Sequence, residues 1–111
     1  GRRWKKKFGD LPKVYAFPEG LIDKYDKKTQ TQIMGIQTCV WTEKIKEVKR
    51  LEFMTFPRLA ALAEAAWTQK KSKDYTDFQK RLQTHLKQYD KWNIHYFNPF
   101  DPTAVKEPIG P

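Results

Sequence analysis

The stretch Ile33-Met34-Gly35-Ile36-Gln37-Thr38-Cys39-Val40-Trp41 decides the fold class of this 111-residue chain. It carries no charged residue, it contains several β-branched residues, and it is apolar at both odd and even positions. A strand that lacks alternation of polar and apolar residues is typical of a strand buried on both faces, as in a parallel sheet. The sequence therefore predicts one buried strand over about 33–41.

Two helices are predicted after this strand. Residues 51–67 are apolar nearly all round, which predicts a helix that is buried on most of its sides. Pro57 lies within this run, so either a new helix begins near Phe56 or one long helix kinks there. Residues 75–92 have apolar side chains at three- and four-residue steps, which predicts an amphipathic helix.

Local signals in the sequence mark the ends of the second helix and the segments without regular structure. Asp74 is a candidate N-cap, and Asn93 marks the expected end of the helix. Residues 21–32 fit either a short helix or a loop. Four prolines among the last thirteen residues predict a tail without regular structure, so the chain divides into residues 1–97 and a Pro-rich tail, 98–111.

Length and charge bound the function. A chain of 111 residues holds one domain, and its net charge is +9. This charge is explained by a lysine-rich solvated surface, but it also leaves open a small basic helical module that binds nucleic acid or another acidic partner. No run approaches the roughly 18 apolar residues of a membrane span, so no membrane partner is expected.

Few side chains could build a self-contained catalytic or metal site. The single cysteine, Cys39, excludes an intramolecular disulfide and a multi-cysteine metal site, and it is expected to be a small buried residue. His85 is expected to pack on the apolar face of its helix, and no partner is identified for His95. We expect no metal site and no cofactor. The five glycines are scattered, so no Gly-rich phosphate loop is present.

Two linked stretches resemble the β-N-acetylhexosaminidases of glycoside hydrolase family 20. Residues 35–43 (Gly-Ile-Gln-Thr-Cys-Val-Trp-Thr-Glu) are similar to the family signature Gly-x-Gln/Glu-x-x-x-Trp-x-Glu. Residues 57–67 (Pro-Arg-Leu-Ala-Ala-Leu-Ala-Glu-Ala-Ala-Trp) are similar to its Pro-Arg-x-x-Ala-x-x-Glu-x-x-Trp helix. Residues 75–82 look like the helix that follows, and residues 14–18 look like the stretch before the last strand.

The resemblance implies an α/β parent, with this chain as the C-terminal piece of a (β/α)8 barrel. The piece would be mostly helical, with strand 33–41 as the last strand of the barrel and the Pro57 helix as part of the last helix. Once its barrel neighbours are removed, the strand would expose two edges and two apolar faces. We therefore expect the isolated fragment to self-associate or to exchange elements between copies.

The resemblance also implies roles for two substrate-binding residues. Trp41 would form a wall of the pocket that holds the acetamido group of the substrate, because an aromatic face packs well against sugar C–H and methyl groups. Glu43 would accept hydrogen bonds from sugar hydroxyls, expected to be O4 and O6 of the non-reducing-end residue. We interpret Arg58 and Glu64 as structural, with their charges satisfied by ion pairs or hydrogen bonds.

The chemistry that the chain lacks is equally informative. Family members hydrolyse terminal N-acetylhexosamine residues by substrate-assisted retaining catalysis, which an adjacent Asp-Glu pair serves. This chain contains no Asp-Glu dipeptide. Tyr15 matches a position after that of the family's acetamido-binding tyrosine and does not inherit its role. The fragment is therefore expected to hold no catalytic residue and to be inactive alone.

Its partner would be an N-acetylhexosaminide glycan, bound together with the rest of the barrel, and not nucleic acid. The resemblance places the parent in a secreted, periplasmic or lysosomal setting.

Overall fold

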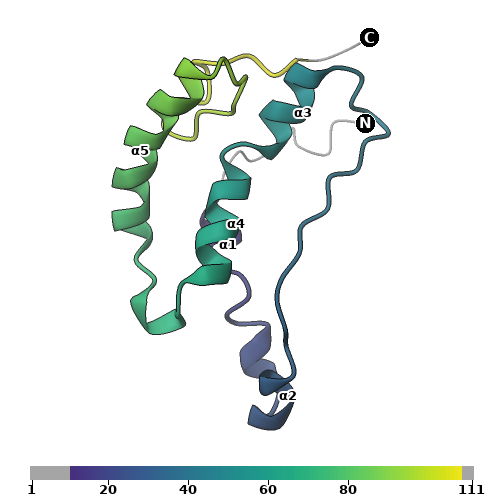
Figure 1. Ribbon diagram of the computed structural model, residues 1–111, viewed down its shortest axis with the longest axis vertical. Coiled ribbons are helices and arrows are strands. Elements are labelled where there is room, and N and C mark those ends of the chain that lie inside the picture. Colours follow the sequence, from purple (N-terminus) through teal and green to yellow (C-terminus); the bar gives the residue numbers. More distant parts are fainter. Residues whose placement is uncertain (1–10, 109–111) are drawn as a thin grey trace.

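The fold consists of helices joined by long irregular segments (Figure 1). The computed structural model describes residues 11–108, so parts of the predicted 1–97 and 98–111 divisions lie outside the described residues. None of the helices in the described range is both long and apolar enough to cross a membrane. In chain order the elements are α1 (Leu11–Ala16), the 3-10 helix η1 (Ile22–Lys24), α2 (Lys27–Thr31), α3 (Val48–Thr55), α4 (Arg58–Trp67), the 3-10 helix η2 (Lys70–Ser72) and α5 (Tyr75–Lys91).

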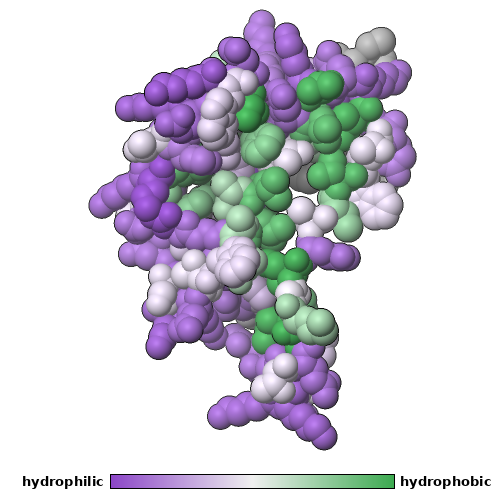
Figure 2. Space-filling view, in the orientation of Figure 1, coloured by the Kyte–Doolittle hydropathy of each residue, from purple (hydrophilic) through white to green (hydrophobic). Residues whose placement is uncertain are grey.

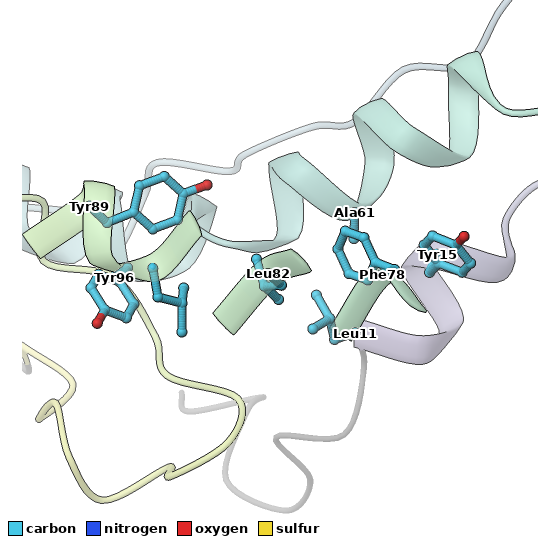
Figure 3. Packing of buried hydrophobic residues seen from close by; sticks show 8 residues of the cluster. Leu11, Tyr15, Ala61, Phe78, Leu82, Tyr89 and Tyr96 are labelled. Carbon is cyan, nitrogen blue, oxygen red and sulfur yellow. The ribbon is translucent and has the colours of Figure 1, made fainter. Parts of the chain in front are cut away.

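One apolar core lies between α1, α4 and α5 (Figure 3). Ala61 of α4 has no exposed surface, and its small side chain allows α1 to lie close against α4. The ring of Tyr15 stacks on that of Phe78, with 4.8 Å between the ring centroids. The buried residues of this cluster are Leu11, Tyr15, Ala61, Phe78, Leu82, Leu86, Tyr89 and Tyr96.

Helix α5 confirms the prediction for residues 75–92, including both of its ends. The carboxylate of Asp74 accepts a hydrogen bond from the backbone N–H of Asp77 at 3.0 Å, which is the predicted N-cap. Asn93 has a φ of 55°, and the N–H of Ile94 donates to the carbonyl of Tyr89 at 3.0 Å. This is the Schellman arrangement that satisfies the last carbonyls of a helix.

The predicted helix over 51–67 is two helices, α3 and α4, separated at Phe56 and Pro57. The backbone of Phe56 is extended (φ −101°, ψ 137°), because a proline disfavours the helical conformation in the residue before it. Of the two alternatives, a new helix is therefore the correct one. Burial on most sides was the wrong expectation: Leu59 is 40% and Trp67 is 90% exposed.

The predicted strand over 33–41 is not formed. The segment runs as an extended trace apart from the helices (Figure 1), and within residues 11–108 the backbone groups of 34–41 find no hydrogen-bond partner. A strand requires a neighbouring backbone, and the described part of the chain provides none. The prediction that the segment is buried is also wrong, since Ile36 is half-buried and the other residues of 33–41 are exposed.

The shorter segments complete the comparison. Residues 21–32, for which helix and loop were both open, contain η1 and α2 with loop between them, and Asp26 caps α2 through the N–H of Thr29 at 2.8 Å. The described part of the tail, residues 98–108, has no helix or strand, as its prolines predict.

Glu64 joins three parts of the chain. The Tyr15 hydroxyl donates to Glu64 Oε1 at 3.3 Å and accepts from the N–H of Asp74 at 3.0 Å. The Arg81 guanidinium donates to both oxygens of Glu64, at 2.7 Å for Oε2. This confirms the structural interpretation of Glu64. Hydrogen bonds from Arg81 hold the pKa of Glu64 below its ordinary value of 4.5.

The packing at Ala61 gives a first prediction. Replacing Ala61 by Leu overfills the space between α1, α4 and α5 and should lower the free energy of unfolding by about 1–3 kcal/mol. Ala63→Leu, on the exposed side of the same helix, is the matched control and should change stability by less than about 0.5 kcal/mol. Urea unfolding followed by circular dichroism measures both. An equal loss in the two variants would contradict the described packing.

The pair Glu64–Arg81 gives a second prediction, in the pH dependence of stability. The folded-state pKa of Glu64 is lowered, so its stabilising contribution is fully present above its unfolded pKa and is lost as pH falls through the folded value. Arg81→Gln should therefore destabilise the chain more at pH 6 than at pH 3. Urea unfolding at a series of pH values measures the difference. Lys80→Gln is the control, because Lys80 is exposed on the same helix. A destabilisation by Arg81→Gln that is constant with pH would refute the assignment.

Candidate functional site

A cavity of about 780 Å³ lies between the 38–45 segment and the helices α3 and α4. The segment forms one wall with Thr38, Cys39, Val40, Trp41, Glu43, Lys44 and Ile45, and the helices form the other with Arg50, Met54, Thr55, Arg58, Leu59 and Leu62. Val14 of α1 completes the lining. Figure 2 shows apolar side chains gathered in a band down this face of the molecule, flanked by polar ones.

Both residues predicted to bind sugar, Trp41 and Glu43, line this cavity. Trp41 is 76% exposed, so most of its indole is available for contact, and the Glu43 side chain is exposed too. Trp41 lies at the end of the extended segment, and Glu43 lies in the turn that the hydrogen bond from the N–H of Ile45 to the carbonyl of Thr42 closes. The structure therefore brings an open aromatic face and a carboxylate to one cavity.

Arg58 fixes the helical wall of the cavity. Its guanidinium donates to the carbonyls of Phe53 and Met54, at 3.3 and 3.2 Å, in the last turn of α3. These carbonyls have no partner within their own helix, so the guanidinium supplies one across the break at Pro57. The guanidinium also lies over the ring of Phe97, 5.2 Å from its centroid. This confirms the interpretation of Arg58 as structural.

Arg50 is a cavity residue that sequence reasoning missed. Its guanidinium donates to Glu107 Oε1 at 2.9 Å and to the carbonyl of Pro108 at 2.7 Å, so it holds the tail against α3. Its side chain is 11% exposed. Fifty-seven residues separate Arg50 from Glu107, and neither residue stands in a recognisable motif. No signal in the sequence pairs them.

The cysteine and the histidines lie away from any reactive arrangement. Cys39 is exposed, which corrects the expectation that it is buried, because the segment that carries it pairs with no other backbone among residues 11–108. His85 is also exposed rather than packed in the core, although its ring contacts that of Tyr89 with centroids 4.7 Å apart. His95 does have a partner, since its Nε2 lies 2.8 Å from the carbonyl oxygen of Lys106. No cluster of metal-binding side chains exists among the residues described.

Charges of both signs line the cavity. Glu43 is the one carboxylate among the described lining residues, and Lys44, Arg50 and Arg58 are cationic. Glycoside hydrolysis needs an acid and either a second carboxylate or a group of the substrate held by one. A single exposed carboxylate beside an indole can instead bind sugar hydroxyls and the apolar face of a ring.

The comparisons with known proteins place the chain in a family. The sequence model described as glycosyl hydrolase family 20, catalytic domain, matches residues 2–70. A β-N-acetylhexosaminidase of Cellulomonas fimi is 35% identical over 79 residues, covering 64% of this chain and 16% of the relative. A β-hexosaminidase of Porphyromonas gingivalis is 30% identical over 92 residues, covering 83% of this chain and 12% of the relative.

A solved structure has the same fold over most of the chain. It is the crystal structure of a family 20 exo-β-N-acetylglucosaminidase from Vibrio harveyi in complex with N-acetylglucosamine. The TM-score is 0.69 at 39% sequence identity, and the match covers 82% of this chain and 14% of the other. The chain therefore spans only 12–16% of the length of these three proteins. With the family model covering more than half of the chain, and with both predicted motifs inside the matched region, the protein belongs to glycosyl hydrolase family 20 and corresponds to part of its catalytic domain.

Proposed function

We propose that this chain is the C-terminal part of the barrel of a β-N-acetylhexosaminidase. The complete protein would hydrolyse terminal non-reducing N-acetylhexosamine residues by substrate-assisted retaining catalysis. Residues 1–97 would belong to the barrel, with 33–41 as its last strand, and 98–111 would form a Pro-rich tail. The activities for which the Cellulomonas fimi, Porphyromonas gingivalis and Vibrio harveyi relatives are named support this proposal.

The observation that carries the proposal is the shared cavity of Trp41 and Glu43. The family resemblance implies that these two residues of the signature contact the sugar. Trp41 would form a wall of the acetamido pocket, since its exposed ring offers a flat apolar surface to the methyl group. Glu43 would accept hydrogen bonds from two sugar hydroxyls, which are stronger than neutral ones because the acceptor is charged.

The fragment would contribute binding but not bond cleavage. An adjacent Asp and Glu would orient the acetamido group and protonate the leaving oxygen, and this sequence contains no such dipeptide. The catalytic pair would come from the rest of the barrel. A parent of this kind would act in a secreted, periplasmic or lysosomal setting. The comparisons lend no support to the alternative of a basic module that binds nucleic acid.

The role of Glu43 is tested in a chimera. The chain is joined to the part of the Vibrio harveyi enzyme that precedes the matched segment. Glu43→Gln should lower kcat/KM for an aryl N-acetyl-β-glucosaminide by roughly 10- to 100-fold, because hydrogen bonds to a charged group contribute about 1.5–3 kcal/mol.

Glu47→Gln is the matched control, since Glu47 is exposed four residues further on and its side chain makes no capping bond to α3. The control should keep the activity of the parent chimera, and circular dichroism shows whether all three proteins are folded. Equal activity of Glu43→Gln and the parent chimera would remove Glu43 from the proposed site.

The isolated chain should be inactive. The purified 111-residue protein should release no more aryl alcohol from an N-acetyl-β-glucosaminide than a mock purification does, because no residue in it can serve as the catalytic pair. Turnover above that background, lost on Glu43→Gln, would overturn the proposal that the catalytic groups lie outside this chain.

A further inference from the structure

We infer that residues 34–41 form a strand-accepting seam, which binds the remainder of a family 20 catalytic domain even when that remainder is a separate polypeptide. The seam consists of the extended backbone of 34–41 together with the apolar helical wall behind it, to which Met54, Leu59 and Leu62 contribute. The inference rests on family membership and on the geometry below, not on the sugar-binding roles of Trp41 and Glu43.

The backbone of the seam is fully available for pairing. Within the described residues, no hydrogen bond engages an N–H or a carbonyl of 34–41. The extended conformation is nevertheless anchored at both ends. The N–H of Ile33 donates to the carbonyl of Gln30 at 3.2 Å, and the N–H of Ile45 donates to that of Thr42 at 2.9 Å. An anchored, extended and unpaired backbone is the template to which a strand adds.

Several apolar side chains around the seam are exposed to water and would be buried by a bound partner. Met34 is fully exposed, while Val40 and Leu59 are each about 40% exposed. Next to them, a second hollow of about 270 Å³ lies between residues 33–36 and the end of α4, lined by Ala65 and Ala66 among others. The apolar band in Figure 2 follows the same face. Covering this face removes apolar surface from water on both sides of the segment.

The relatives indicate what covers the seam. In the Vibrio harveyi structure the matching piece makes up 14% of a single chain, so about six sevenths of that chain lies outside the match and is available to pack against it. An extended segment has two edges, because successive peptide groups point in opposite directions. A second copy of this chain brings one such segment and can cover one edge, which leaves the other open to further copies. The remainder of the catalytic domain can supply a strand to each edge.

The experiment is co-expression of this chain with the Vibrio harveyi enzyme from which the matching segment is deleted. The chain carries an affinity tag, and the deleted enzyme carries none. We expect the deleted enzyme to be soluble and to co-purify in a 1:1 complex when this chain is present. In the complex, the amides of 34–41 should exchange hydrogen at least tenfold more slowly than in the chain alone, and alkylation of the exposed thiol of Cys39 should slow by a similar factor.

Proline variants test each edge separately. Thr38→Pro and Cys39→Pro remove backbone donors that point to opposite edges, so each should abolish co-purification. Gln69→Pro is the matched control, because Gln69 has a φ of −61° and the residue before it is extended, which suits proline. This control should co-purify as the unmodified chain does.

Three outcomes overturn the inference. These are an insoluble deleted enzyme in the presence of this chain, a complex in which 34–41 exchanges as fast as in the chain alone, and a self-associated chain that excludes the deleted enzyme. A protected complex without glycosidase activity supports the inference and counts against the proposed function, so the two proposals fail separately.

Discussion

The contact of Tyr15 with α4 and α5 is the constraint on which the arrangement of the helices depends. Its ring stacks on Phe78, and its hydroxyl joins Glu64 of α4 to the N–H of Asp74, which begins α5. Burial raises the pKa of Tyr15, so the hydroxyl stays protonated and able to donate through the neutral range. The six-residue helix α1 thereby fixes the positions of both α4 and the start of α5. Helix α4 in turn forms part of the wall of the candidate sugar cavity.

The contrast between these helices and the segment 33–41 follows from where each finds its hydrogen bonds. A helix pairs its own backbone groups, so α4 and α5 form as soon as one face can be buried. A strand needs another backbone, and residues 11–108 offer none in the right place. The same sequence therefore folds its helical parts and leaves its most β-like stretch extended and uncovered.

Local signals in the sequence were sufficient for the helix ends. The cap at Asp74 and the end at Asn93 each depend on one residue acting on adjacent backbone, and each is confirmed. At Pro57 the sequence left a new helix and a kink open, and the structure has a new helix. The spacing of two motifs was sufficient for the family. Burial could not be predicted in the same way, because it depends on contacts between residues far apart in the sequence. Arg50 illustrates this limit, since its role as a link between the cavity and the tail depends on Glu107, with which it shares no pattern.

The two contacts of the proposed sugar site come from a segment with few backbone hydrogen bonds among the described residues. Trp41 and Glu43 stand on a segment held by backbone hydrogen bonds only near its ends, at Ile33 and Ile45, among the residues described. Sugar recognition requires contact groups held to within about 0.5 Å, which a free extended segment does not provide. The helical wall is already rigid, because Arg58 joins α3 to α4. The missing precision would therefore come from strands on either side of 34–41, so that the backbone pairing that would close the proposed barrel would also fix the indole and the carboxylate.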